Sequence, residues 1–194
     1  MTLVTRLTNA LARPVPEGVR RGDLDDAPDE DTREAAVLVA VTDRPEPGLL
    51  FIVRQDDLRH HPGQVAFPGG KVDPDDRDPA HTALREAWEE IALDPEAVKV
   101  CGLADRYRTV TNYCITPVVA VVPPDLPLTL DPNEVSDWFE APLGFVLDPA
   151  NHRRAMADFD GRARAYTEID WQGRRIWGAT AAMIVNLSRR LAWT

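Results

Sequence analysis

Three glutamates within one short string, Glu86, Glu89 and Glu90, are the residues of this sequence best suited to chemistry. On an α-helix, positions i, i+3 and i+4 lie on one face, so these carboxylates are expected to be neighbours. Like charges held this close repel, and a hard divalent cation such as Mg²⁺ or Mn²⁺ relieves the repulsion through oxygen ligands. The spacing therefore predicts a metal site. A solvated helix face paired with arginines such as Arg85 is the alternative that the string alone leaves open.

A glycine pair precedes these glutamates, in Phe67-Pro68-Gly69-Gly70. Glycine adopts backbone conformations that other residues cannot, and it lets a carbonyl or a phosphate approach the main chain closely. One loop would then bring backbone groups toward the acidic face, and the Gly70 carbonyl is a candidate metal ligand. The pair and the triplet together favour a metal site over a solvated face.

The helix that must carry the glutamates is expected to run from Pro79 to Ile91. Asp78 suits the N-cap, and Pro79 suits the first helical position. Apolar residues at steps of four, Ala83, Ala87 and Ile91, predict the buried face. The glutamates are expected on another side of this helix.

Apolar stretches around this helix predict a sheet. Residues 35–42 and 49–55 are strand-like and flank the turn-forming residues 43–48, which predicts a hairpin. A second hairpin is expected over residues 166–177, around a Gln-Gly pair. Further strands are expected over residues 64–67, 98–103, 115–122 and 134–139, and further helices near residues 3–11 and 179–191. This layout predicts a mixed sheet with helices packed on it, an α+β fold.

The length of 194 residues and the hydrophobic content of 44% are enough for one sizeable core. Residues 1–34 are expected to form an N-terminal helix and an acidic linker, and residues 35–194 a single domain. Two cysteines, Cys101 and Cys114, lack metal-site spacing and are expected to be buried free thiols. No bilayer-spanning apolar run and no secretory signal are recognised, so a cytoplasmic location is expected.

The formal net charge is −10 and the sequence pI is about 4.8. Such a surface repels nucleic acid and anionic membranes, so neither is expected as a partner. A phosphorylated small molecule stays compatible with this charge, provided that metal ions or arginines concentrate positive charge where it binds.

Residues 70–93, GKVDPDDRDPAHTALREAWEEIAL, resemble the Nudix box, G-x5-E-x7-R-E-U-x-E-E-x-G-U, in which U is aliphatic. Two positions differ from the box. Asp76 occupies the position of the first glutamate of the box, with one extra residue before Arg85. Ala92 occupies the position of the second glycine. The resemblance implies a Nudix-type α/β/α sandwich, with a mixed β-sheet between helices, and metal-dependent hydrolysis of a diphosphate bond.

The string at residues 58–73, LRHHPGQVAFPGGKVD, is similar to the LR-x-H-x-G-x-V-x-FPGG-x-x-D pattern of Nudix coenzyme A diphosphatases. In that subfamily an acidic pair, here Asp73 and Asp76, accompanies the lengthened box. Residues 177–180 also look like its closing WGxTA segment. The resemblance implies that coenzyme A or a derivative is cleaved to 3′,5′-ADP and 4′-phosphopantetheine. Another nucleoside diphosphate derivative (a dinucleotide, ADP-ribose or a nucleoside triphosphate) and a non-catalytic ligand sensor are the alternatives.

Within the metal site, Glu86 and Glu90 are expected to be the primary ligands because they lie one helical turn apart. The Gly70 carbonyl would join them. Glu89 is expected to be a further ligand or the base that activates water. Glu134, in a distal loop, is the alternative base.

Arg85 is expected to orient the glutamates through a salt bridge, with Asp76 as a candidate partner. Arginine binds phosphate in a bidentate manner, so a phosphorylated substrate should find cations near these loops. The residues expected to bind substrate are Arg54, Arg59, His61, Gly69, Gly70 and Lys71, with Arg106 and Arg108 as further cations nearby. A homodimer is an expectation from the resemblance alone.

Overall fold

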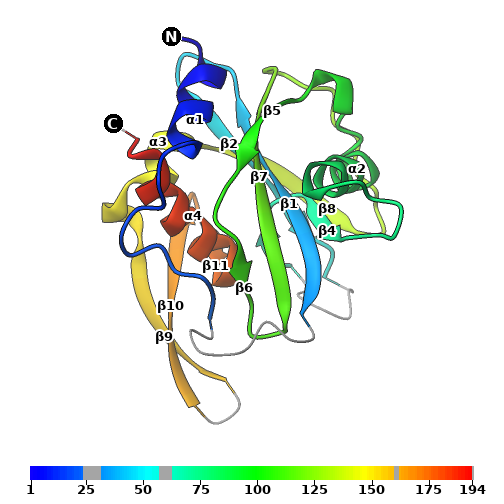
Figure 1. Ribbon diagram of the computed structural model, residues 1–194. Coiled ribbons are helices and arrows are strands. Elements are labelled where there is room, and N and C mark those ends of the chain that lie inside the picture. The colour runs from blue at the N-terminus through cyan, green and yellow to red at the C-terminus, as the bar shows by residue number, and fades with distance from the viewer. Residues whose placement is uncertain (24–31, 57–62, 160–161, 194) are drawn as a thin grey trace.

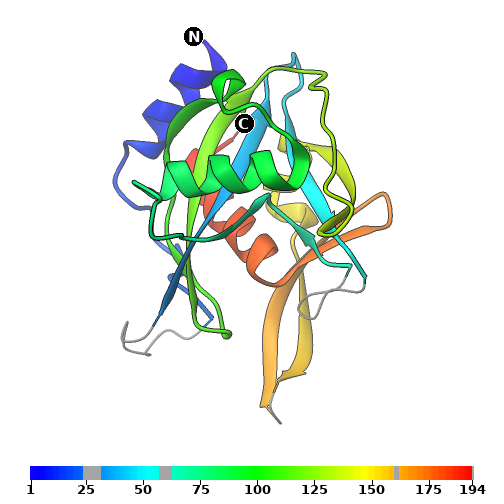
Figure 2. The ribbon, with the colours of Figure 1, turned by 90° about the vertical axis from the view of Figure 1, so that its right-hand side faces the viewer.

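A mixed sheet lies between one helix on one face and three helices on the other in the computed structural model (Figures 1 and 2). The structure describes residues 1–23, 32–56, 63–159 and 162–193. α2 (Pro79–Ile91) covers the first face, and α1 (Leu3–Leu11), α3 (Leu143–Leu147) and α4 (Gly178–Leu191) cover the second. Two short 3₁₀ turns, η1 (Pro95–Ala97) and η2 (Pro149–Asn151), complete the helical elements of these described residues. This arrangement confirms the expected α/β/α sandwich.

The central sheet has the main strand order β3-β2-β1-β7-β5, and β4 pairs with β1, β6 with β7 and β8 with β2. β1 and β7 are parallel, and the other pairs are antiparallel, so the sheet is mixed as expected. The expected first hairpin is present as β1 and β2, with Val41 opposite Leu49. The strands are β1 (Arg33–Thr42), β2 (Gly48–Arg54), β3 (Val65–Ala66), β4 (Gly69–Lys71), β5 (Lys99–Leu103), β6 (Tyr107–Arg108), β7 (Tyr113–Val122) and β8 (Val135–Pro142).

Side chains that alternate along β1 contribute to both hydrophobic cores, one on each face of the sheet. Val37, Val39 and Val41 point into the layer shared with α1, α3 and α4. Ala36, Leu38 and Ala40 point into the layer shared with α2. The two alanines leave room for α2 to pack closely on β1 at those positions.

A second sheet of three strands has the order β11-β10-β9. β10 (Arg162–Trp171) and β11 (Arg174–Trp177) form the expected hairpin. Its turn places Gln172 and Gly173 at positive φ, 52° and 80°. β9 (Arg153–Phe159) was not predicted, and it pairs with β10 along its whole length. The β9–β10 hairpin projects beyond the rest of the domain (Figures 1 and 2).

The N-terminal segment packs against the main body of the fold. Leu7 and Ala10 of α1 are buried in the same core as α4. The Asn186 side chain accepts a hydrogen bond from the Arg20 N–H at 2.9 Å and donates one to the Arg20 carbonyl at 2.7 Å. The division of the chain at residue 34 stays a prediction, and much of the acidic linker lies outside the described residues.

Both cysteines are buried and free, as expected. Within the described part of the chain, no helix is both long enough and apolar enough to cross a membrane.

Candidate active site

The helix of the site begins and ends where its sequence requires. Asp78 is the N-cap, and its Oδ1 accepts a hydrogen bond of 2.8 Å from the His81 N–H, while Pro79 occupies the first helical position. At the other end, Ala92 takes a left-handed conformation with φ of 51°, at the position where the Nudix box has glycine. These caps confirm the expected helix.

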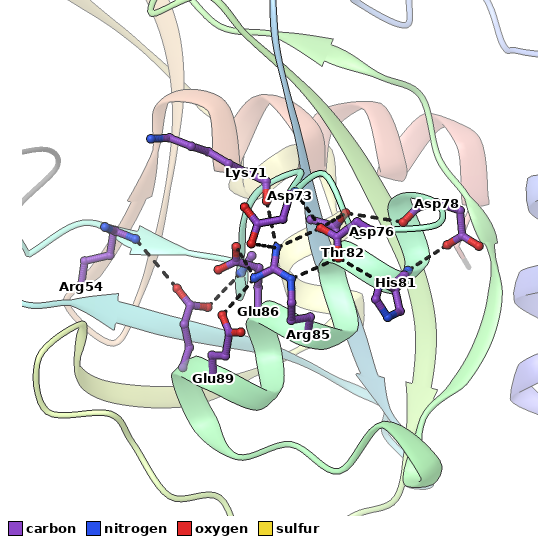
Figure 3. A network of polar contacts seen from close by, with 12 residues as sticks. Arg54, Lys71, Asp73, Asp76, Asp78, His81, Thr82, Arg85, Glu86 and Glu89 are labelled. Carbon is purple, nitrogen blue, oxygen red and sulfur yellow. Dashed lines mark hydrogen bonds and ion pairs between the residues drawn. The ribbon is translucent and has the colours of Figure 1, made fainter.

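The guanidinium of Arg85 is the centre of the site (Figure 3). Nε and Nη2 donate to the two carboxylate oxygens of Asp76, at 3.1 and 3.0 Å. Nη1 donates to Glu86 and to Glu89, each at 3.0 Å, and Nη2 also donates to the Lys71 carbonyl at 3.0 Å. A guanidinium has five N–H donors, so every donor of Arg85 has an acceptor. The expected salt bridge between Arg85 and Asp76 is present, and these contacts together fix the orientation of the guanidinium.

The three glutamates differ sharply in exposure. The side chain of Glu90 is 2% exposed, that of Glu86 16% and that of Glu89 54%. The helical spacing predicted that Glu90 would lie away from the buried face, and this prediction was wrong. Glu90 points into the protein, and its Oε2 accepts a hydrogen bond of 2.9 Å from the Gly69 N–H. The reason is tertiary, because α2 packs on β4 as well as on β1 and so buries a wider face.

Negative charge is crowded around Glu90. Burial, together with repulsion from Glu86 and Glu134, raises the pKa of Glu90 from 4.5 to about 8, against the opposing effects of the Gly69 N–H and of Arg54. Burial also raises the pKa of Glu86, and the Arg85 guanidinium opposes that rise. The arginines of the site therefore do not fully compensate the negative charge of ionised Glu86 and Glu90.

A hard divalent cation fits this donor set chemically. Among the described residues, no three acidic, His or Cys side chains surround one point closely enough to hold a metal ion. Glu86 and Glu89 both accept hydrogen bonds from Arg85. The buried Glu90 with its raised pKa and acidic neighbours is the kind of excess charge that a cation relieves. Gly70 lies directly against this cluster, since a Cβ there would be 2.5 Å from the Glu86 carboxylate.

Two of the expected substrate-binding cations border the glutamates. Arg54, at the end of β2, places Nη1 3.9 Å from Glu90 Oε1, and its buried Nε has no hydrogen-bond partner among the described residues. Lys71 is exposed, and its ammonium forms no ion pair within the described part of the chain. The Gly69 N–H is already used by Glu90. Arg59 and His61 lie outside the described residues.

Glu134 lies near the glutamates, whereas Arg106 and Arg108 are engaged by other partners. Glu134 is exposed, and it lies near the site because the Asp131 N–H donates to the Glu90 carbonyl at 2.9 Å and the Glu134 N–H donates to Asp131 at 3.1 Å. Arg106 instead pairs with Glu34. Arg108, the other cation suggested nearby, donates to Asn112 at 2.7 Å.

Comparison with known proteins places the chain in a family. A family model described as the NUDIX domain matches residues 32–159, and the chain belongs to the Nudix family. Nudix proteins of this kind are hydrolases of nucleoside diphosphate derivatives, and they generally use divalent ions such as Mg²⁺ or Mn²⁺.

Two relatives carry the name "Uncharacterized Nudix hydrolase NudL". The one from Cronobacter sakazakii is 43% identical over 159 residues, which cover 82% of this chain and 83% of that protein. The one from Escherichia coli K12 is 42% identical with the same coverage. A solved MutT/nudix family protein from Enterococcus faecalis is 16% identical, has a TM-score of 0.52, and aligns with 96% of this chain and 68% of its own. That likeness supports the fold alone.

Sequence reasoning missed two members of the site, His81 and Thr82, which both contact Asp76. It also missed one contact, because Gly69 was expected to bind substrate and its N–H binds Glu90. His81 and Thr82 occupy variable positions of the Nudix box, so no pattern in the sequence marks them. The Gly69 contact depends on the packing of β4 against α2, which the spacing of residues in the sequence does not predict.

Proposed function

We propose that this chain hydrolyses the diphosphate bond of coenzyme A or a derivative, giving 3′,5′-ADP and 4′-phosphopantetheine. The observation that carries the hydrolytic part is the buried Glu90 carboxylate, crowded by Glu86 and Glu134 beside the glycine pair. The choice of coenzyme A rests on the string at residues 58–73, of which residues 58–62 lie outside the described part of the structure.

Glu86 and Glu90 would hold the divalent ion, Mg²⁺ or Mn²⁺, with Glu89 and the Gly70 carbonyl as further donors. When bound, such an ion neutralises diphosphate oxygens and lowers the pKa of a coordinated water. Arg85 fixes the directions of Glu86 and Glu89 before any substrate arrives, because its five donors are all engaged. The protein's contribution is thus positioning plus electrostatic stabilisation.

Two carboxylates are candidates for the base that takes a proton from the attacking water. Glu89 is half exposed but is held by Arg85 at 3.0 Å. Glu134 is exposed, and its carboxylate makes no hydrogen bond to another described residue. Glu134→Gln and Glu89→Gln, compared by the pH dependence of kcat, would separate the two roles, because loss of the base removes the acidic limb of the profile.

Cations at the border of the site would receive the substrate's phosphates. Arg54 is suited to this, since its buried Nε is unpartnered within the described chain and its guanidinium already faces Glu90. Lys71, Arg59 and His61 are proposed to contribute as well, together with the Gly69–Gly70 backbone. The proposed compartment is the cytoplasm. A homodimer stays a prediction, which light scattering would test.

The purified protein tests this function directly. It would be incubated with Mg²⁺ or Mn²⁺ and, in separate reactions, coenzyme A, ADP-ribose, a dinucleotide and a nucleoside triphosphate. We expect 3′,5′-ADP and 4′-phosphopantetheine from coenzyme A at the highest kcat/KM, and no product with excess chelator. Glu96→Gln, at an exposed glutamate in η1, is the matched control and should act like the parent. A higher kcat/KM for another substrate would contradict coenzyme A, and no turnover of any would contradict hydrolysis.

A further inference from the structure

One buried carboxylate behind the glutamates collects an unusual number of donors. The Asp76 side chain is 1% exposed, and Arg85 binds both of its oxygens. Its Oδ1 also contacts His81 Nδ1 at 2.8 Å, and its Oδ2 accepts from the Thr82 hydroxyl and from the Asp73 N–H, each at 2.9 Å. Asp76 therefore has five hydrogen bonds, of which Arg85 supplies only two.

The additional donors answer a geometric need of this sequence. Aspartate is one methylene shorter than the glutamate of the Nudix box, and one extra residue separates it from Arg85. A shorter side chain on a longer loop needs other contacts to fix it. The first turn of α2 supplies them, because His81 and Thr82 point back toward the loop from that turn (Figure 3).

We propose that His81 is a positioning residue, which with Thr82 fixes the Asp76 carboxylate and, through Arg85, sets Glu86 and Glu89 for a divalent cation. This inference rests on the metal-binding part of the proposed function and not on the choice of substrate. The contact requires His81 Nδ1 to carry a proton, because Arg85 holds the pKa of Asp76 well below its usual range and the carboxylate can only accept.

Removing His81 would leave Asp76 Oδ1 with the Arg85 Nε–H as its one donor, so the carboxylate and the guanidinium would be held less firmly. Loss of such outer hydrogen bonds around a metal site costs about 10- to 100-fold in metal affinity or activity. The loss of the His81 contact should also change the orientation of the Arg85 guanidinium in the metal-free protein.

Paired substitutions separate the hydrogen bond from the bulk of each side chain. His81→Asn keeps a donor near the Nδ1 position, whereas His81→Leu removes it. Thr82→Ser keeps the hydroxyl of this fully buried residue, whereas Thr82→Val removes it. Arg77→Ala, at the exposed residue next to Asp76, is the control. His81 is about a third exposed, so His81→Leu should fold, and His81→Gln, whose amide reaches too far, gives a second loss-of-contact variant.

Three measurements read the outcome. The first is the Arg85 Nε–H resonance in ¹⁵N spectra of the metal-free protein, the second is Mn²⁺ affinity by calorimetry, and the third is kcat separated from KM. We expect His81→Leu and Thr82→Val to shift or broaden the resonance, to weaken Mn²⁺ binding about tenfold and to lower kcat with little change in KM. His81→Asn, Thr82→Ser and Arg77→Ala should stay near the parent.

Parent-like Mn²⁺ affinity and an unchanged Arg85 resonance in His81→Leu would overturn the proposal. Equal losses in His81→Leu and His81→Asn would also overturn it, because the hydrogen bond would then not be what matters. If coenzyme A is not cleaved but the resonance and Mn²⁺ affinity follow the expected pattern, the substrate assignment fails and the positioning role stands.

Discussion

The Gly69 N–H donates a hydrogen bond of 2.9 Å to Oε2 of Glu90. This bond joins the glycine loop of β4 to the most buried carboxylate of α2, and it explains why the two motifs must lie together. The amide donor holds the carboxylate in position but only partly offsets the effect of its burial, so the pKa of Glu90 stays raised. A divalent cation bound beside Glu90 would favour the ionised form of the carboxylate.

Glu90→Gln should make the stability of the metal-free protein less sensitive to pH. The pKa of Glu90 is raised from 4.5 to about 8, so the folded protein binds more protons than the unfolded chain between these values. Its contribution to stability is therefore complete below pH 4.5 and is lost as the pH rises through about 8. At ~1.4 kcal/mol per pKa unit, the effect amounts to a few kcal/mol.

Thermal melts with chelator from pH 5 to 9 would measure this. Glutamine keeps an acceptor for Gly69, so the variant should melt above the parent at pH 8 and near it at pH 5. Its kcat should fall at least about a hundredfold. Parallel pH profiles of melting temperature for the two proteins would contradict the proposed state of Glu90.

The two glycines should respond differently to alanine. Gly69 has φ of 151°, and a Cβ there would lie 2.6 Å from the Val37 Cα, so Gly69→Ala should lower the free energy of unfolding by about 3 kcal/mol or more. Gly70→Ala would press on the Glu86 carboxylate at 2.5 Å, so it should lower kcat and Mn²⁺ affinity more than stability.

Gly144→Ala is the control for both variants, because a Cβ there meets nothing within 4 Å. Urea unfolding and Mn²⁺ titration would be measured for all three proteins. Equal stability losses in Gly69→Ala and Gly70→Ala would show that the second glycine serves the fold and not the carboxylate cluster.

Arg85→Lys should disturb both the fold and the site. An ammonium has three donors and no fork, so it cannot reproduce the bidentate contact with Asp76 or reach the remaining acceptors. The buried Asp76 would lose partners, and we expect a loss of about 1–3 kcal/mol in unfolding free energy together with weaker Mn²⁺ binding. Arg77→Lys, at an exposed neighbour, should change neither quantity, and parental stability in Arg85→Lys would count against the network.

Lys71→Ala should affect substrate binding and leave folding intact. The Lys71 side chain is exposed and forms no ion pair within the described residues, while its carbonyl, which Arg85 uses, is retained in alanine. Losing one phosphate contact of about 1 kcal/mol should raise KM roughly fivefold with an unchanged melting temperature. Lys99→Ala on β5 is the matched control, and an unchanged KM in Lys71→Ala would remove Lys71 from the proposed binding residues.

Local signals predicted the elements that carry the site. Asp78 and Pro79 mark the start of α2, and the apolar runs mark β1, β2 and β7, because capping and strand patterns depend on neighbouring residues. The glutamates themselves stand out by spacing. Arg85 and Asp76 could be paired only through the family resemblance.

Other features depend on contacts between distant segments. β4 is Gly-Gly-Lys, which has no strand preference, and it is a strand because β1 pairs with it. β9 carries arginines and alanines without a clear apolar alternation, and its pairing with β10 defines it. The burial of Glu90 follows from how α2 sits on β4, so a helical wheel placed it on the wrong side.

The most direct test of the metal centre is diffraction from crystals soaked in Mn²⁺ at pH 8, with data collected at the manganese absorption edge. We expect an anomalous peak within about 2.2 Å of carboxylate oxygens of both Glu86 and Glu90. The same soak of Glu90→Gln crystals should show a much weaker peak. A parent crystal with no peak at these carboxylates, or with manganese bound only elsewhere, would contradict the account.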